Sequence, residues 1–376
     1  MRVLVAPDKF KGSLTALEVA EAIGRGLAAA GVAVRLFPLA DGGDGSVDAA
    51  VCAGSTAHPV RVHGADGELR DAAFAFDGTT AVVEVATTCG LATLPAGELV
   101  PMSASSHGFG EAVAAAVTAG ARRIVLCLGG SASTDGGAGM LTALGVRFRD
   151  AHGGEVDPAG ETLIKIADLD VSGLLPLGGV ELVVATDVSN PLVGPDGAAA
   201  VFGPQKGATP AQVDLLEVGL SHLAQLLGNN PQPGASPADT PGVEEPGVGA
   251  AGGLGFACRW LGAQRVPGAD FFLDLLDFDG AVVDCTAVVT GEGRIDGQTL
   301  AGKLPAVVAS RAIPRPVYAV VGQSLLADDE CQRLGLRQVV ALADLDAADS
   351  SRDPELSRRL TEQAGTLIGQ RLRARE

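Results

Sequence analysis

The sequence predicts a protein of the α/β class, and three observations support this prediction. Six short apolar runs each break abruptly into glycine, acidic or hydroxyl residues, as the buried strands of a parallel sheet do. Helical patterns lie between these runs. The chain has 376 residues, 47% of them hydrophobic and 19% charged, so it has enough apolar surface for two domains or for one large domain with insertions.

The first strand, loop and helix are predicted at the N-terminus. The apolar run 3–6 ends in Pro7 and Asp8. Thr15 and Glu18 then have the spacing of a capping box, in which each side chain accepts a hydrogen bond from the other residue's backbone N–H. We therefore expect a helix to begin near Thr15.

Five further runs follow the same pattern, and each is expected to be a buried strand that stops where the polar residues begin. They are 34–39 before Asp41, 124–128 before Gly129, 182–185 before Asp187, 288–289 before Gly291 and Glu292, and 317–321 before Gly322. Ligands of open parallel sheets bind beyond the carboxyl ends of the strands. We therefore expect these polar clusters to share a site.

Two segments depart from this alternation. Residues 60–84 alternate apolar and polar side chains around two turn signals, 64–67 and 77–78, which predicts antiparallel hairpins and part of a second domain. Residues 229–249 contain five prolines, which predicts a surface loop or linker that cannot hold a helix.

Charge and composition exclude several classes of protein. The 45 acidic and 27 basic residues give a net charge of -18, and only 3% of residues are aromatic, so no nucleic-acid partner is expected. The six cysteines form no CxxC pair and the five histidines show no metal-binding spacing, which indicates buried thiols in a reducing compartment. With no signal peptide and no run of 18 apolar residues, we expect a cytoplasmic protein without a membrane partner. The sequence does not indicate an oligomeric state.

The segment 129–139, GGSASTDGGAG, is the most specific candidate for phosphate binding. It directly follows a predicted strand, and its glycines and hydroxyls offer backbone and side-chain donors at a helix N-terminus, where the helix dipole favours an anion. The residues predicted to bind nucleotide or phosphate are Gly129, Gly130, Ser131, Ser133, Thr134, Asp135, Gly136 and Gly137.

Asp41 and Asp44 are candidate metal ligands. They flank two glycines in the motif DGGDG, where backbone N–H groups can turn toward an anion and two carboxylates can hold a divalent cation that bridges phosphate oxygens. An ordinary turn with an N-capping aspartate is the alternative.

Three further groups of polar residues lie near predicted strand ends. Pro191 forces Asn190 into an extended conformation three residues after Asp187, and Lys206 lies in a rigid turn as a point charge for phosphate. Each of these also fits a structural role. The second group is Glu292, Arg294 and Asp296, and the third group is Asp8, Lys9 and Lys11. The two lysines of the third group either contact a phosphate or carboxylate or extend into solvent.

Together these motifs resemble the type I glycerate kinases, which phosphorylate D-glycerate with ATP. The matching segments cover nearly the whole chain in family order. They are APDKFKGSLTALEVAEAI from residue 6, ADGGDG, GGSASTDGGAGML, DVSNPLVGP, FGPQKGA, GAAGGLG and TGEGRIDGQTLAGK. The chain departs from the family pattern at His107 and Phe109, where Tyr-Gly-Thr-Gly is usual, and at Gln323, where Ala-Gly-Ser is usual.

The resemblance implies a Rossmann-like domain with a parallel sheet, built from both chain ends (1–58 and 285–376). A second α/β domain (59–284) is inserted between them, with the active site in the cleft. It also implies transfer of phosphate from ATP to D-glycerate, giving 2-phosphoglycerate and ADP.

The mechanistic hypothesis assigns a role to each charged motif. Asp41 and Asp44 hold Mg²⁺, the glycine-rich segment holds phosphate, and Lys206 offsets developing charge. Asp187 is the candidate base for the glycerate hydroxyl, with Glu292 and Asp296 as rivals for the base or metal roles.

The residues expected to bind the substrate are Asp8, Lys9, Lys11, Asn190 and Arg294. Arg294 either pairs with the glycerate carboxylate or forms a structural ion pair. Two alternatives stay open: a kinase for another small hydroxy acid, and a non-catalytic sensor of a small acid or nucleotide.

Overall fold

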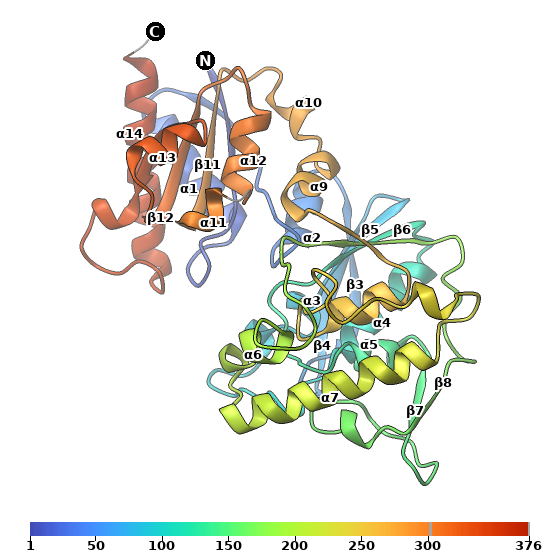
Figure 1. Cartoon of the computed structure of the whole chain (residues 1–376). Coiled ribbons are helices and arrows are strands. Elements are labelled where there is room, and N and C mark those ends of the chain that lie inside the picture. Colours follow the sequence, from blue (N-terminus) through green and yellow to red (C-terminus); the bar gives the residue numbers. More distant parts are fainter. Residues whose placement is uncertain (301–302, 375–376) are drawn as a thin grey trace. The chain divides into compact units, whose positions relative to one another are not determined.

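The computed structural model describes residues 1–300 and 303–374, and the chain divides into two compact units (Figure 1). Residues 301 and 302, which belong to the last motif quoted above, lie outside the described residues. Unit 1 comprises residues 1–41, 48–54 and 268–376, and unit 2 comprises residues 42–47 and 55–267. The predicted α/β class with two domains is confirmed.

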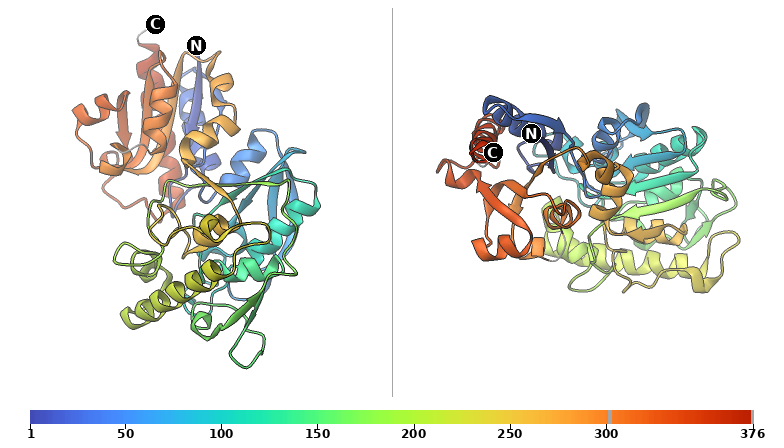
Figure 2. Two further views of the ribbon diagram at one scale, coloured as in Figure 1. Left: turned by 45° about the vertical axis from the view of Figure 1, so that its right-hand side comes forward. Right: turned by 90° about the horizontal axis from the view of Figure 1, so that it is seen from above.

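Unit 1 is built on a five-stranded sheet in which every pair of neighbours is parallel. Its strand order is β13-β12-β11-β1-β2. The strands are β1 (Arg2–Pro7), β2 (Ala33–Leu36), β11 (Ala287–Ile295), β12 (Val317–Ser324) and β13 (Leu336–Ala341). The helices α1 (Ala16–Ala29) and α14 (Pro354–Arg373) lie on one face and α12 (Leu304–Arg311) on the other (Figures 1 and 2).

Three strand predictions need correction in this unit. The strand expected over 34–39 is β2, which is shorter and mostly exposed because it pairs only with β1 at the sheet edge. The strand expected to stop at Gly291 continues to Ile295, and the one expected to stop at Gly322 continues to Ser324. These two extensions pair with each other, so Glu292 and Arg294 lie within a strand and not in a loop.

The predicted capping box starts α1. The backbone N–H of Glu18 donates to Thr15 Oγ1 (3.2 Å), and that of Thr15 donates to Glu18 Oε2 (2.9 Å). Glycine lets α1 approach α14 closely, because a Cβ on Gly26 would lie 2.0 Å from the carbonyl oxygen of Glu362. This contact joins the two ends of the chain in one core.

The expected boundary at residues 284 and 285 differs from the structure, where the division falls at 267 and 268. The helices α9 (Gly268–Leu275) and α10 (Phe278–Val282) belong to unit 1. The ring of Phe278 lies 6.0 Å from that of Phe37, and Arg35 Nη1 donates to the carbonyl of Ala281 (3.1 Å). Because of these contacts with residues near β2, residues 268–284 belong to unit 1 and not to the inserted unit. The remaining unit 1 helices are α11 (Gly297–Leu300) and α13 (Asp328–Arg333).

Unit 2 has a mixed six-stranded sheet with the order β10-β9-β6-β5-β4-β3. The strands are β3 (Thr56–His63), β4 (Leu69–Phe76), β5 (Thr80–Glu84), β6 (Arg123–Cys127), β9 (Glu181–Ala185) and β10 (Gln264–Val266). The pairs β3–β4 and β4–β5 are antiparallel, which confirms the predicted hairpins, and the other pairs are parallel. The carboxyl ends of β3, β5, β6 and β9 therefore lie on one edge. A separate two-stranded sheet joins β7 (Arg147–Arg149) to β8 (Asp168–Asp170).

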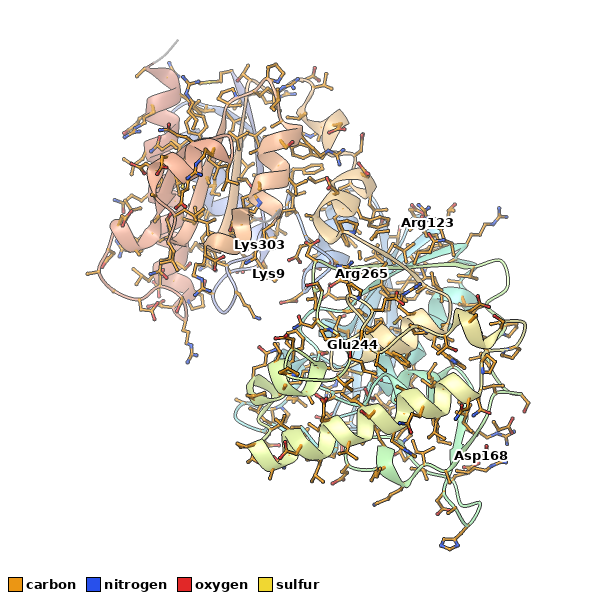
Figure 3. All side chains as sticks on the ribbon, viewed as in Figure 1. Lys9, Arg123, Asp168, Glu244, Arg265 and Lys303 are labelled. Atoms are coloured by element: carbon orange, nitrogen blue, oxygen red, sulfur yellow. The ribbon has the colours of Figure 1, made fainter. Side chains whose placement is uncertain are left out.

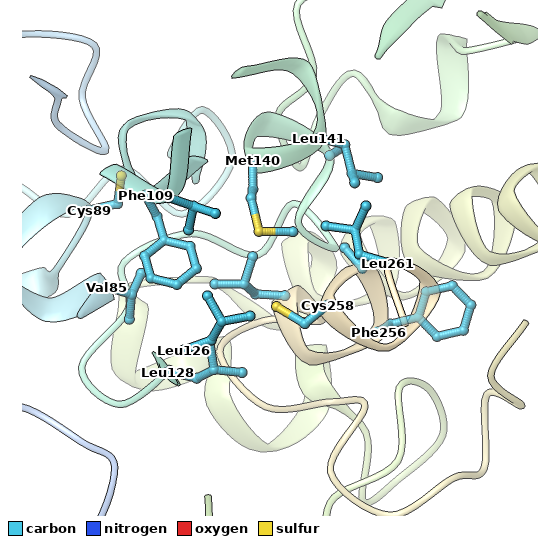
Figure 4. Packing of buried hydrophobic residues seen from close by; sticks show 14 of the residues in the cluster. Val85, Cys89, Phe109, Leu126, Leu128, Met140, Leu141, Phe256, Cys258 and Leu261 are labelled. Carbon is cyan, nitrogen blue, oxygen red and sulfur yellow. The ribbon is translucent and has the colours of Figure 1, made fainter. Parts of the chain in front are cut away.

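The helices of unit 2 surround a large apolar core (Figure 4). Phe109, Leu126, Met140 and Cys258 are buried in it, so the departure at Phe109 is a packing residue. The helices are α3 (Val85–Thr88), α4 (His107–Thr118), α5 (Ala138–Ala143), α6 (Ala198–Phe202), α7 (Pro210–Asn229) and α8 (Leu254–Trp260), while α2 (Ser46–Cys52) crosses the division between the units.

The remaining sequence expectations concern the proline-rich segment, the cysteines and the membrane. After α7 ends at Asn229, only one short 3-10 turn (Pro237–Asp239) interrupts residues 230–249, as predicted. Five of the six free cysteines are buried, and Cys52 is exposed. Within residues 1–300 and 303–374, no helix has the length and apolar character needed to cross a membrane.

Candidate active site

Charged residues gather at the carboxyl ends of the unit 1 strands. Asp8 follows β1, Asp41 follows β2, and Glu292 lies in the last part of β11. Lys9 Nζ lies 3.5 Å from Asp8 Oδ1 and 3.9 Å from Asp41 Oδ1, while Lys303 Nζ lies 3.5 Å from Glu292 Oε1. Figure 3 labels the two lysines. We call these five residues the acid–lysine cluster.

Two carboxyl groups of the acid–lysine cluster titrate near neutrality. Burial raises the pKa of Asp8 to about 7, against the opposing effect of Lys9. Burial likewise raises the pKa of Glu292 to about 7, against the opposing effect of Lys303. Glu292 Oε2 is buried and has no hydrogen-bond partner among the residues that the structure describes. Carboxyl groups perturbed in this way are typical of functional sites.

Arg294, Asp296 and Lys11 lie beside this cluster in the sequence but in more exposed positions. Arg294 Nη2 lies 3.1 Å from Asp296 Oδ2, and the Arg294 side chain is 60% exposed. Lys11 is exposed. The structural ion pair expected as the alternative for Arg294 is therefore present, and it leaves much of the guanidinium open to solvent.

In unit 2, Asp135 organises the glycine-rich loop, residues 129–137. Its Oδ2 accepts hydrogen bonds from Ser106 N (2.8 Å), Ser106 Oγ (2.7 Å) and Gly139 N (3.2 Å). Its Oδ1 accepts from Ser133 Oγ (3.1 Å) and Gly137 N (3.1 Å). The carboxylate is fully buried. Asp135 thus fixes the shape of the loop through an extensive hydrogen-bond network.

Lys206 lies against the same loop. Its residue is 2% exposed, and its ammonium group donates to Ser131 Oγ (2.9 Å) and to the carbonyl of Ser133. Burial lowers the pKa of Lys206 to about 7, while the charge of Asp135 opposes this shift. The lysine therefore anchors the loop from within unit 2.

Glu84 is a site residue that the sequence analysis missed. It ends β5 and is 1% exposed, and its Oε2 accepts hydrogen bonds from Gly45 N (3.1 Å) and Val47 N (3.1 Å). The N–H group of Gly45, in the segment expected to form an anion nest, is thus bound to a carboxylate, as is that of Val47 shortly after it. The sequence contained a signal for this role, because Glu84 is an acidic residue that follows an apolar run (81–83), as Asp187 follows the run 182–185.

Gly42–Val47 packs on the glycine-rich loop inside unit 2. A Cβ on Gly129 would lie 2.5 Å from Gly43 Cα, so only glycine permits this approach. Asp44 is exposed in this segment, whereas Asp41 belongs to unit 1, where it pairs with Lys9.

Asp187 and Asn190 lie after β9, at the same edge as the glycine-rich loop. Asp187 is exposed. Asn190 Nδ2 donates to the carbonyl of Asp196 (2.8 Å), and its own carbonyl accepts from Gly247 N and Gly249 N. Asn190 therefore holds two loops together, and Asp187 is the more exposed of the two residues.

A family model, curated proteins and a solved structure were compared with this chain, and all of them point to the same family. The sequence model of the Glycerate kinase family matches residues 3–369. A Bacillus subtilis (strain 168) protein named Glycerate kinase is 45% identical over 332 residues, covering 86% of this chain and 85% of its own. An Escherichia coli (strain K12) protein named Glycerate 2-kinase is 42% identical over 342 residues, covering 88% and 86%. A crystal structure of a protein assigned as glycerate kinase 2 from Salmonella typhimurium LT2 superposes with a TM-score of 0.80 at 36% identity, covering 100% of this chain and 98% of that one.

Proposed function

Because the chain belongs to the glycerate kinase family, it is a kinase, and we propose that it transfers the γ-phosphate of ATP to D-glycerate, giving 2-phosphoglycerate and ADP. The acid–lysine cluster is the observation that carries the proposal. It combines carboxyl groups with pKa near 7 and two lysines at strand ends, where phosphoryl transfer needs both charge neutralisation and acid–base groups.

The glycine-rich loop is proposed to bind phosphate. Ser131 and Ser133 are held by Lys206 and Asp135, so their positions are set before any ligand binds. Preorganised donors cost no reorganisation during the reaction. Lys206 is proposed to offset developing charge from beneath the loop in its protonated form, which is present together with the neutral form near pH 7.

Asp41 and Asp44 are proposed as ligands of Mg²⁺. Mg²⁺ is usually bound by one or two carboxylates together with water and substrate phosphates. Asp41 is 41% exposed at its side chain and Asp44 is exposed, so each carboxylate is accessible to an ion within its own unit. Bound Mg²⁺ supplies neutralisation of the phosphate charge.

Asp187 is proposed as the base that accepts the proton of the glycerate hydroxyl. Its exposed carboxylate at the carboxyl end of β9 can accept a hydrogen bond from a substrate without breaking the Asp135 network. Glu292 is the main rival, because its pKa near 7 suits proton transfer at neutral pH. Asp296 is already paired with Arg294.

Lys9, Lys11 and Arg294 are proposed to meet the glycerate carboxylate, with Asp8 orienting Lys9. The Arg294 side chain is 60% exposed, so it can reach the carboxylate of a substrate. Asn190 is proposed to position the loop after β9.

The test is ADP release from Mg-ATP with and without D-glycerate, followed by phosphorus NMR of the product. We expect glycerate-dependent release and 2-phosphoglycerate. Formation of 3-phosphoglycerate would support kinase activity on D-glycerate but contradict the proposed position of the phosphate. Absence of release with D-glycerate, together with release on another small hydroxy acid, would overturn the substrate.

A further inference from the structure

A cluster of two histidines and one glutamate lies in unit 2, apart from the residues used above. His63 ends β3, and His107 and Glu111 lie one turn apart at the start of α4. The sequence showed no metal-binding spacing among the histidines, because His63 and His107 are brought together only by packing of α4 on β3. Figure 1 shows both elements in the same unit.

Backbone contacts fix the geometry of this cluster. A Cβ on Gly108 would lie 1.8 Å from the carbonyl oxygen of His63, so glycine allows the first turn of α4 to touch the end of β3. The backbone N–H of His63 donates to Glu111 Oε2 (2.7 Å). The other carboxylate oxygen, Glu111 Oε1, faces both imidazoles.

The distances fit a tetrahedral metal ion. His63 Nδ1 lies 2.8 Å and His107 Nε2 lies 3.7 Å from Glu111 Oε1, and the two rings are 5.5 Å apart at 81°. One ligand atom from each residue lies within 4.8 Å of the others. Ligand atoms of tetrahedral zinc are about 3.3 Å apart for metal–ligand bonds of about 2.0–2.1 Å. The two separations from Glu111 Oε1 lie on either side of that value, and the shorter one is a hydrogen bond that a bound ion replaces.

We propose that His63, His107 and Glu111 bind one Zn²⁺ ion. Two imidazoles and one carboxylate favour Zn²⁺ over Mg²⁺, which prefers oxygen ligands, so this ion is distinct from the Mg²⁺ that accompanies ATP. All three residues are partly exposed, which leaves an entry path and room for water as a fourth ligand.

The ion acts as a clamp near the glycine-rich loop. Ser106, the residue before α4, donates two hydrogen bonds to Asp135. Zn²⁺ at the first turn of α4 therefore links the end of β3 to the N-terminal end of α4, which contacts the glycine-rich loop through Ser106. Because it binds the folded state, it stabilises unit 2.

The experiment measures Zn²⁺ binding to the full chain by competition with a chromophoric chelator, without nucleotide. We expect one ion per chain. His107→Phe and His63→Phe keep a ring of similar size but remove the ligand nitrogen, and each is expected to weaken binding at least about 100-fold. His152→Ala removes an exposed histidine on the 150–154 turn and is the matched control, expected to bind as the wild type does.

X-ray absorption of the Zn²⁺-loaded protein identifies the ligands. We expect a nitrogen and oxygen shell at about 2.0–2.1 Å and no sulfur shell at about 2.3 Å. Circular dichroism verifies that the variants fold, and Glu111→Gln, which retains an acceptor for His63 N, supplies a third variant that should also bind more weakly. Absence of stoichiometric binding, unchanged affinity in the folded histidine variants, or loss of binding in Cys52→Ser would overturn the proposal.

Discussion

Unit 2 and unit 1 bury carboxyl groups in different ways. In the glycine-rich loop, Asp135 accepts hydrogen bonds from Ser106, Ser133, Gly137 and Gly139. In the acid–lysine cluster, Asp8 and Glu292 each face a lysine at 3.5 Å, and Glu292 Oε2 is buried without a hydrogen-bond partner among the described residues.

The difference in partners separates a structural role from a chemical one. A buried carboxylate with many donors is held in one conformation and organises its surroundings. A buried carboxyl group with few donors has a raised pKa and exchanges a proton near neutral pH. We therefore expect the Asp135 network to contribute mainly to stability. Asp8 and Glu292 contribute to pH dependence, as does Lys206, whose pKa is also about 7.

The largest expected effect on stability comes from Asp135→Ala. The change leaves several buried donors without their acceptor and removes the negative charge that favours protonated Lys206. We expect a loss of about 4 kcal/mol in the free energy of unfolding, measured by urea denaturation. Asp44→Ala, an exposed position in the same unit, is the control and should change this quantity by less than about 0.5 kcal/mol. A loss below about 1 kcal/mol in Asp135→Ala would contradict the role of the network.

Asp187→Asn tests which unit supplies the base. We expect kcat to fall at least about 100-fold while the protein stays folded, because Asn keeps the shape but cannot accept the proton. Glu292→Gln and Asp296→Asn are the matched variants in unit 1. Near-normal turnover in Asp187→Asn, with loss of turnover in either of the others, would move the base to unit 1.

Arg294→Ala sharpens the description of the unit 1 site. Its ion pair with Asp296 is exposed and contributes little to stability. We expect KM for D-glycerate to rise about tenfold, with a smaller change in kcat, since a charged hydrogen bond to the substrate is lost. Arg333→Ala, whose ion pair with Asp329 is also exposed, should leave KM unchanged. An unchanged KM in Arg294→Ala would show that Arg294 does not bind the substrate and has only the structural role of its ion pair with Asp296.

The last expected effect is the pH dependence that Asp8 gives to stability. Its pKa is about 7 in the folded protein and 3.8 ordinarily, so the folded state holds more protons than the unfolded state between about pH 4 and pH 7. Its contribution to stability is present below pH 4 and is lost as the pH rises through 7.

Asp8→Asn should remove the part of this slope that Asp8 contributes and raise the free energy of unfolding at pH 8 by about 4 kcal/mol relative to the wild type, because the pKa of Asp8 differs by about 3 between the two states. Urea titrations from pH 4 to pH 8 measure the slope. Asp71→Asn, an exposed position, serves as the control and should leave it unchanged. An unchanged slope in Asp8→Asn would show that Asp8 does not titrate near neutrality.

Local patterns in the sequence determined the class of the fold and many of its elements. The capping box of Thr15 and Glu18, the hairpins expected within residues 60–84 and the strands that end near Asp8 and Asp187 were all predictable. These features depend on neighbours within a few residues, so periodicity and turn residues are sufficient to find them. The family followed from motifs spread along the whole chain.

Only the tertiary structure decided which polar residues meet and how far each is buried. Three pairings depend on strand order and helix packing. They are those of Glu84 with Gly45 and Val47, of Lys303 with Glu292, and of His63 with Glu111. The same holds for the place of residues 268–284 in unit 1. Such contacts join distant segments, and burial sets the pKa of each group, so neither can be read from local pattern.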